Sequence, residues 1–141
     1  MRAKISRKKF IKDSFLAGAG AFMLRRVIEE QKETVMTVNG PIDPQQMGFT
    51  LTHEHVMADF IGAKQVSKSR YNADEVFETA LPFVKDAKAK GVNTFVDCTP
   101  AYLGRDAGIL KRLSDVVSIN MLTTTGYYGA VNEKFVPKHA Y

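Results

Sequence analysis

The chain has 141 residues, of which 45% are hydrophobic and 25% charged, so one ordinary domain with an apolar core can form. Its net charge of +5 is unevenly distributed, because residues 1–26 carry eight basic side chains and one acidic one, which leaves −2 for residues 27–141. A slightly acidic body argues against the basic groove that a nucleic-acid-binding protein needs.

Residues 1–26 are predicted to form a leader. A basic start precedes an apolar run at residues 15–24, and these ten residues are too few for the roughly 20 that span a bilayer. Ala-x-Ala sites within residues 17–21 are typical of an export signal. The segment SRKKFIK resembles a twin-arginine signal with Lys8 in place of the second arginine. We therefore expect export to the periplasm, and the alternative is a basic leader that stays attached to a cytoplasmic protein. Residues 27–34 are expected to link this leader to the domain.

Two histidines lie in the first predicted core strand, at residues 49–56, which follows a predicted hairpin at residues 34–42. Side chains at positions i and i+2 of a strand project to the same face. The strand therefore directs the imidazoles of His53 and His55 to one place, as a metal ion requires. Glu54 lies between them and is expected to face the opposite side, without a catalytic role.

The next element is a predicted helix at residues 74–90, where apolar side chains recur at helical spacing. Asn72 is suited to cap its start and Gly91 to end it. Pro82 lies inside the pattern, so we expect the helix to kink or to split near Thr79.

A β-branched strand is predicted at residues 92–97, a second helix from residue 105 or 106 to 113, and a third strand at residues 117–123. This alternation of strands and helices predicts an α/β fold with a parallel sheet. Cys98 is the only cysteine, which excludes an internal disulfide, and we expect a buried small hydrophobic residue there rather than a nucleophile. Arg105 and Asp106 are expected to be structural, since a carboxylate suits the start of a helix.

The number of predicted units bears on the size of the protein. Residues 35–141 offer about three βα units, whereas a complete (β/α)8 barrel typically needs ~250 residues. We therefore expect the N-terminal part of a larger protein, and a small open α/β domain is the alternative.

Three stretches resemble the phosphotriesterase family of the amidohydrolase superfamily. Residues 48–56 read GFTLTHEHV and are similar to the family's first strand, and residues 96–106, VDCTPAYLGRD, resemble its second strand and the following turn. Residues 125–128, TGYY, resemble the end of its third strand. The three matches keep the family's order and spacing over about residues 35–130.

The resemblance implies a TIM barrel with two divalent metal ions at the carboxyl ends of its strands. His53 and His55 match the ligands on the first strand, and the remaining ligands belong to strands beyond the third. Zinc is the expected metal, and manganese, cobalt and iron are compatible with such ligands. Tyr128 matches an aromatic wall of the substrate pocket. His139 matches no ligand position and is expected to be exposed.

The implied activity is hydrolysis of a lactone or phosphotriester by a metal-activated hydroxide, so the expected partner is a small ester substrate. A homodimer is one assembly that the complete parent protein could form. Two alternatives stay open: another amidohydrolase, such as an amide-ring hydrolase or a deaminase, and a truncated product that binds metal weakly. A catalytic zinc takes about three protein ligands, so we expect no useful turnover from this polypeptide alone.

Overall fold

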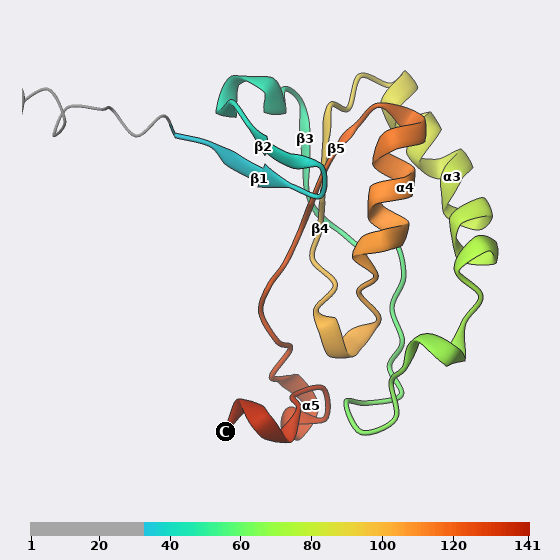
Figure 1. Cartoon of the computed structure of the whole chain (residues 1–141), viewed down its shortest axis with the longest axis vertical. Helices are drawn as coiled ribbons and strands as arrows, with labels where there is room; N and C mark the ends of the chain where they lie inside the picture. The colour runs from blue at the N-terminus through green and yellow to red at the C-terminus, as the bar shows by residue number, and fades with distance from the viewer. Residues whose placement is uncertain (1–32) are drawn as a thin grey trace, which may run out of the picture. The chain divides into compact units, whose positions relative to one another are not determined.

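The computed structural model describes residues 33–141. The predicted leader at residues 1–26 and most of the predicted linker lie outside this range. Within residues 33–141, no helix is both long and apolar enough to cross a membrane. The elements follow one another as drawn in Figure 1: β1 (Val35–Thr37), β2 (Gly40–Ile42), η1 (Pro44–Met47), β3 (Thr50–Glu54), η2 (Lys68–Arg70), α3 (Ala73–Ala89), β4 (Thr94–Asp97), η3 (Ala101–Leu103), α4 (Ala107–Val117), β5 (Asn120–Thr123), α5 (Ala130–Glu133) and η4 (Lys138–Ala140).

Strands β1 and β2 form an antiparallel hairpin, which confirms the sequence prediction for this region. The tight turn requires Gly40 at φ +111°, a backbone conformation that glycine adopts without a steric cost. The Thr37 hydroxyl donates to the Gly40 carbonyl at 2.7 Å. The hairpin is held next to β5, because Val38 N–H donates to the Met121 carbonyl at 2.9 Å.

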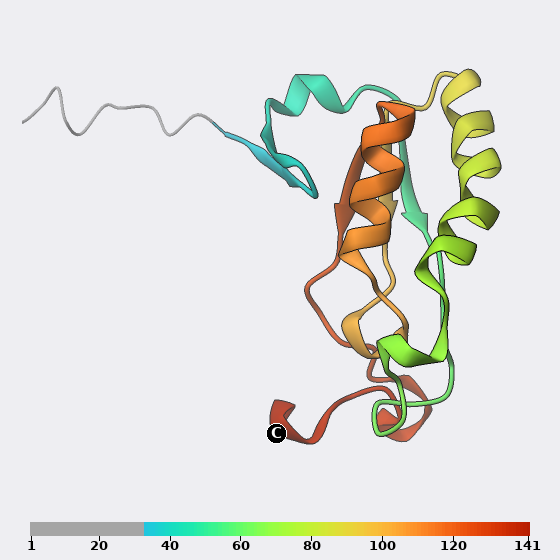
Figure 2. The same ribbon diagram turned by 45° about the vertical axis from the view of Figure 1, so that its right-hand side comes forward.

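Strands β3, β4 and β5 form a parallel sheet in that order, as the alternation of elements predicted. Thr94 of β4 pairs with Thr50 of β3 on one side and with Asn120 of β5 on the other. Both long helices lie on the same side of this sheet and next to each other (Figures 1 and 2). The core between helices and sheet is made of buried apolar side chains: Phe77, Val84, Val92, Phe95, Ile109, Leu110, Leu113, Ile119 and Met121.

Helix α3 begins and ends where the sequence predicted. The Asn72 side chain accepts hydrogen bonds from the backbone N–H groups of Asp74 and Glu75, which satisfies two donors that the first turn leaves free. After the helix, Gly91 adopts φ +94°. The N–H of Val92 then donates to the Ala87 carbonyl at 3.1 Å, which closes the last turn.

The expected split of this helix near Thr79 is wrong, because α3 is continuous from Ala73 to Ala89. Pro82 has no N–H to donate to the Glu78 carbonyl, but it lies on the exposed side of the helix, where water can take the place of the lost bond. The Thr79 hydroxyl donates to the Glu75 carbonyl at 2.8 Å, so the polar side chain also supports the helical turn.

Pro82→Ala is expected to stabilise the protein by about 2 kcal/mol. Alanine is about 3 kcal/mol more favourable than proline in a helix interior, and the greater freedom of the unfolded chain offsets up to about 1 kcal/mol of that. Urea unfolding followed by far-UV circular dichroism measures the change, with the exposed helical substitution Lys85→Ala as the control. A lower urea midpoint for Pro82→Ala than for the wild type would contradict the expectation.

The boundary between α4 and β5 differs from the prediction. Helix α4 extends to Val117 rather than stopping at residue 113, so β5 begins at Asn120 rather than at residue 117. The helix ends because Ser118 adopts the left-handed region at φ 55°, a conformation that glycine more commonly marks in a sequence. The Ser114 hydroxyl donates to the Ile119 carbonyl at 2.6 Å and fixes the turn.

Asp106 is the N-cap of α4, as predicted, and accepts from the N–H groups of Gly108 and Ile109. Its other oxygen accepts from the Tyr71 hydroxyl at 2.5 Å, and Lys68 lies 3.3 Å away. Burial acts to raise the pKa of Asp106, but these hydrogen bonds outweigh it and lower that pKa. Burial and the hydrogen bond to Asp106 raise the pKa of Tyr71 to about 12.

Asp106→Asn is expected to destabilise the protein by about 1 kcal/mol at pH 7, because asparagine keeps the cap but loses the charge that strengthens its hydrogen bonds. The folded pKa of Asp106 lies below the unfolded value of about 3.9, so its contribution is present above that value and disappears as the pH falls through the folded pKa. Urea midpoints at pH 7 and below pH 3 check this, and equal differences at both pH values would contradict it.

Candidate active site

The two histidines of the predicted metal site line one cavity. His53 is in β3, whereas His55 is the first residue after the strand, which is shorter than predicted. Their ring centroids are 5.2 Å apart and their planes cross at 69°. The expectation that both imidazoles share one side is confirmed, because both line the same cavity at the carboxyl end of β3.

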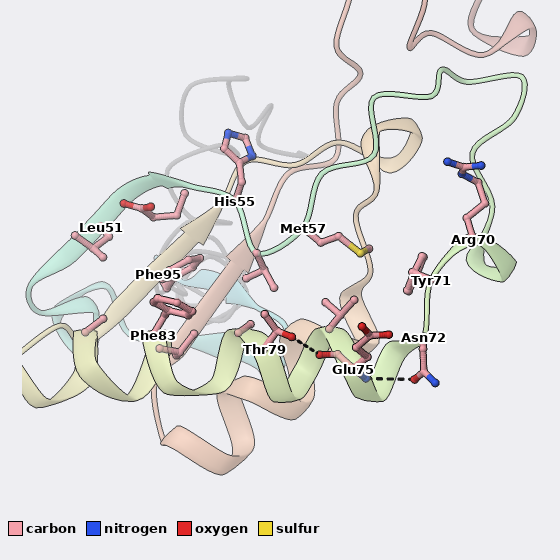
Figure 3. Close-up of a pocket in the computed structure, with 16 residues that line it drawn as sticks. Leu51, His55, Met57, Arg70, Tyr71, Asn72, Glu75, Thr79, Phe83 and Phe95 are labelled. Carbon is pink, nitrogen blue, oxygen red and sulfur yellow. Dashed lines mark hydrogen bonds between the residues drawn. The ribbon is translucent and has the colours of Figure 1, made fainter.

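Glu54 lies between the histidines but does not line that cavity; it lines the groove between β3 and α3, which His55 also borders. Figure 3 shows this groove, with Thr79 and Phe83 on the helix side and the His55 ring directed away from α3. Glu54 and His53 thus line spaces on opposite sides of the strand, as the period of two predicted, whereas His55 borders both spaces.

His55 is held by residues at the carboxyl end of the neighbouring strand β4: Asp97, its last residue, and Thr99 just after it. Its Nδ1 atom lies 2.9 Å from the Thr99 hydroxyl, and the Thr99 N–H donates to Asp97 Oδ1 at 2.9 Å. The second oxygen of Asp97 accepts from the N–H of Val56, the residue after His55, at 2.8 Å. Asp97 and Thr99 are 2% and 0% exposed, so the carboxylate and the hydroxyl are buried, whereas the His55 ring is exposed toward the cavity.

Sequence reasoning did not assign Asp97 and Thr99 to the site. The available signal was their position, because polar residues directly after a parallel strand lie at the edge of the sheet where such folds place their sites. Their partners, His55 and Val56, directly follow β3, more than 40 positions earlier in the chain, and only the paired sheet shows which residues meet.

The cavity in front of the histidines has a volume of about 520 Å³, within the range of small-molecule sites. Its wall is mostly apolar and aromatic, and its lining residues are His53, His55, Ala58, Phe60, Cys98, Pro100, Leu103, Thr124, Gly126, Tyr127 and Tyr128. The loops after β3, β4 and β5 all contribute to it, so it lies at the carboxyl ends of the strands.

Tyr128 lies in this wall, as expected for a residue after the third strand of the sheet. Its ring packs against the Phe135 ring, with centroids 5.7 Å apart. The Phe135 ring in turn contacts that of Phe60, from the loop after β3, with centroids 5.8 Å apart. This aromatic row joins the loop after β5 to the loop after β3. The Ala63 N–H strengthens the connection by donating to the Lys134 carbonyl at 2.9 Å.

His139 is exposed, as expected, but it has partners. Its Nε2 atom lies 3.3 Å from the Tyr127 hydroxyl, and its ring meets the Tyr102 ring edge to face, with centroids 5.9 Å apart. Arg105 is structural, as expected, because its guanidinium donates to the Thr124 carbonyl and ties the start of α4 to the segment after β5.

The prediction for Cys98 needs correction, because its side chain is half-buried rather than buried and lies in the cavity wall beside the histidines. Strand β4 ends at Asp97, so Cys98 is the first residue after the strand, where side chains turn toward the carboxyl-end cavity. Its thiol is 3.8 Å from the Thr52 carbonyl.

The donor chemistry of the two histidines suits a divalent transition metal. Because Nδ1 of His55 is taken by Thr99, its Nε2 is the atom left for a ligand, which is the usual way a metal-binding imidazole is oriented. Within residues 33–141, no group of three or more His, Cys, Asp or Glu side chains is arranged to hold a metal ion. The described residues therefore fit part of a metal site.

Known proteins with similar sequences share this region. The chain is 38% identical over 87 residues to aryldialkylphosphatase from Saccharolobus solfataricus, an alignment covering 62% of this chain and 28% of that protein. A phosphotriesterase homology protein from Mycobacterium tuberculosis is 34% identical over 96 residues, covering 65% and 28%. N-acetyltaurine hydrolase from Xenopus tropicalis is 26% identical over 121 residues, covering 67% and 35%.

The fold agrees with these sequence matches. A double mutant of organophosphorus hydrolase from Deinococcus radiodurans superposes with a TM-score of 0.61 at 31% identity, covering 67% of this chain and 29% of that one. This chain thus spans about a third of the length of the relatives it matches, and its parallel sheet corresponds to part of their barrel. The match to the family itself extends over residues 33–140. The chain belongs to the phosphotriesterase family.

Proposed function

We propose that this chain carries the first-strand ligands of a metal-dependent hydrolase of the phosphotriesterase type. The observation that supports the proposal best is the pair His53 and His55, which line one cavity at the carboxyl end of a parallel strand. Active sites of parallel α/β folds lie at this end of the strands. The relatives named as an aryldialkylphosphatase and an organophosphorus hydrolase support the hydrolytic activity.

The metal would be held in part by His53 and by Nε2 of His55, whose Nδ1 is engaged with Thr99. Zinc is the first choice for imidazole ligands, with manganese, cobalt and iron compatible. When bound, two such ions supply a hydroxide nucleophile at neutral pH and polarise the phosphoryl or carbonyl oxygen. The chain's own contribution is to hold both imidazoles on a strand, so that little reorganisation is needed.

The substrate we propose is a small, largely apolar ester, either a phosphotriester or a lactone. Phe60, Leu103 and Tyr128 give the cavity an apolar and aromatic wall, which suits an aryl or alkyl group of such a substrate. Tyr128 also carries a hydroxyl that can donate a hydrogen bond to an ester oxygen. We therefore assign Tyr128 to substrate binding.

The second candidate is hydrolysis of an amide, supported by the match to N-acetyltaurine hydrolase. The same metal chemistry cleaves either bond, because both substrates present a polarisable carbonyl or phosphoryl oxygen. We rank the ester first, since the aryldialkylphosphatase is 38% identical against 26% for the amide hydrolase.

We also propose that the 141-residue polypeptide turns over no substrate by itself. A catalytic zinc takes about three protein ligands, and residues 33–141 offer the two histidines without such a group of three. The complete site would then need ligands supplied by further strands of a barrel.

The test begins with metal binding by the purified chain. Titration with Co²⁺, followed by its visible absorption, is expected to show weak binding that Zn²⁺ competes away. Assays with an aryl phosphotriester, a γ-lactone and N-acetyltaurine are expected to show no turnover by the chain alone. A Co²⁺ spectrum without imidazole coordination would contradict the metal assignment, and turnover by the 141 residues would contradict the need for further ligands.

The choice between the two candidate substrates needs a longer polypeptide that carries the remaining ligands. It is expected to hydrolyse the phosphotriester or the lactone faster than the amide. The opposite order would favour the second candidate.

A further inference from the structure

The hydrogen bond between His55 and Thr99 is part of a closed arrangement around one buried carboxylate. Asp97 Oδ2 accepts from the N–H of Val56, which is attached to His55, and Asp97 Oδ1 accepts from the N–H of Thr99. The Asp97 carboxylate therefore fixes the backbone on both sides of the hydrogen bond, at Val56 next to His55 and at Thr99 itself. Such an arrangement restricts where the His55 ring can lie and which of its nitrogen atoms faces the interior.

We propose that Thr99, fixed in place by Asp97, is a positioning residue that holds His55 with its proton on Nδ1 and the lone pair of Nε2 free for the cavity. The inference rests on the proposed metal site for its functional meaning. The tautomer itself, however, is a property of the chain without any metal.

The direction of the hydrogen bond follows from the surroundings of Thr99. A hydroxyl can accept through two lone pairs but donates only one proton, so both directions are chemically open. The Asp97 carboxylate accepts from the backbone N–H of Thr99 at 2.9 Å and is 2% exposed, so its negative charge near this hydrogen bond is poorly screened by water. Close to a negative charge, an Nδ1–H that faces Thr99 is favoured over an Nδ1 lone pair in the same place. Nδ1 of His55 is thus the protonated nitrogen, and Thr99 is its acceptor.

His53 provides a comparison within the same cavity. Its ring lies 5.2 Å from that of His55, so both imidazoles experience a similar solvent and a similar cavity. The side-chain hydrogen bond to a buried threonine distinguishes His55. A tautomer preference caused by Thr99 should therefore appear at His55 and not at His53.

The first experiment measures the tautomers in the full chain by long-range ¹H–¹⁵N correlation spectra, in metal-free buffer at a pH where the imidazoles are neutral. His55 of the wild type is expected as the Nδ1–H form, and Thr99→Val is expected to shift it toward the Nε2–H form while His53 is unchanged. Thr99→Ser keeps the hydroxyl and is expected to restore the wild-type pattern. A predominant Nε2–H form of His55 in the wild type overturns the proposal, and that measurement needs no variant to fold.

Thr123→Val is the matched control. Within the part of the chain that the structure describes, Thr123 Oγ1 is buried without a hydrogen-bond partner. The same substitution at Thr123 therefore removes a hydroxyl without breaking a hydrogen bond. It lies on the neighbouring strand β5 and is expected to leave the tautomers of both histidines as in the wild type. A shift in His55 caused by Thr123→Val as large as that caused by Thr99→Val would show a general effect on the sheet and overturn the assignment.

The second experiment measures affinity for Co²⁺. Thr99→Val is expected to weaken binding about 10–100-fold, as the loss of a partner behind a ligating histidine commonly does, and Thr99→Ser to recover most of it. Unchanged affinity of Thr99→Val would overturn the functional part of the inference. Absence of Co²⁺ binding by the wild type would instead count against the proposed metal site, and the tautomer measurement would still decide the role of Thr99.

Discussion

His53→Ala is expected to remove metal binding from this chain. Loss of a partner behind a metal ligand already costs about 10–100-fold in affinity, so loss of one of two imidazole ligands is expected to cost more than about 100-fold. His53 is exposed, so the substitution removes few packing contacts and the fold should persist. Co²⁺ titration and the zinc content after dialysis measure the effect, and in a polypeptide with the remaining ligands hydrolysis should fall together with the metal content.

His139→Ala is the control for that experiment. It removes the third histidine of the chain, which is exposed and contacts Tyr127 rather than the pair at His53 and His55. Metal content equal to the wild type is expected for this variant. The same metal content in His53→Ala would contradict the assignment of His53 as a ligand.

Asp97→Ala is expected to be the most destabilising substitution near the site, by about 2–4 kcal/mol. It leaves the N–H groups of Val56 and Thr99 without their acceptor beside a carboxylate that is 2% exposed, and an unsatisfied buried donor costs about 1–3 kcal/mol. Domains are stable by only about 5–15 kcal/mol, so the loss is a large share of the total. Urea unfolding followed by circular dichroism gives the change in free energy of unfolding.

Asp86→Ala is the matched substitution on the surface. Asp86 forms an exposed ion pair with Lys90, at 2.7 Å, and such pairs contribute about 0.5 kcal/mol or less within a helix. A shift of the urea midpoint by Asp97→Ala no larger than that by Asp86→Ala would show that the two hydrogen bonds of Asp97 contribute little to the free energy of unfolding.

The order of helices and strands could be predicted because the residues that define each element lie within it or directly beside it in the sequence. Asn72 lies directly before the apolar repeat of α3, and Gly91 lies directly after it, so both ends could be predicted. The end of α4 could not, because Ser118 takes a left-handed conformation for which the sequence shows no glycine. The split expected at Pro82 does not occur for a similar reason, since tolerance of proline in a helix depends on its facing solvent, which only the packed helix shows.

The site could be predicted where it depends on strand geometry and could not where it depends on pairing between strands. His53 and His55 are two positions apart, so their common side follows from the period of a strand. Thr99 reaches His55 only because β3 and β4 pair in a particular register. The place of Cys98 in the cavity wall depends on where β4 ends, at Asp97, which the sequence pattern does not define.

Within residues 33–141, β3 lies at one edge of the three-stranded sheet and pairs only with β4. Edge strands tend to open locally at a lower free energy than central strands. The carboxyl end of β3, which carries the histidines, is fastened by the Cys98 N–H to the Glu54 carbonyl at 2.8 Å and by the Val56 N–H to Asp97. The rate at which a bound ion leaves is therefore expected to follow the rate at which these two hydrogen bonds break. Hydrogen exchange of the Cys98 and Val56 amides measures that rate, and metal release can be compared with it.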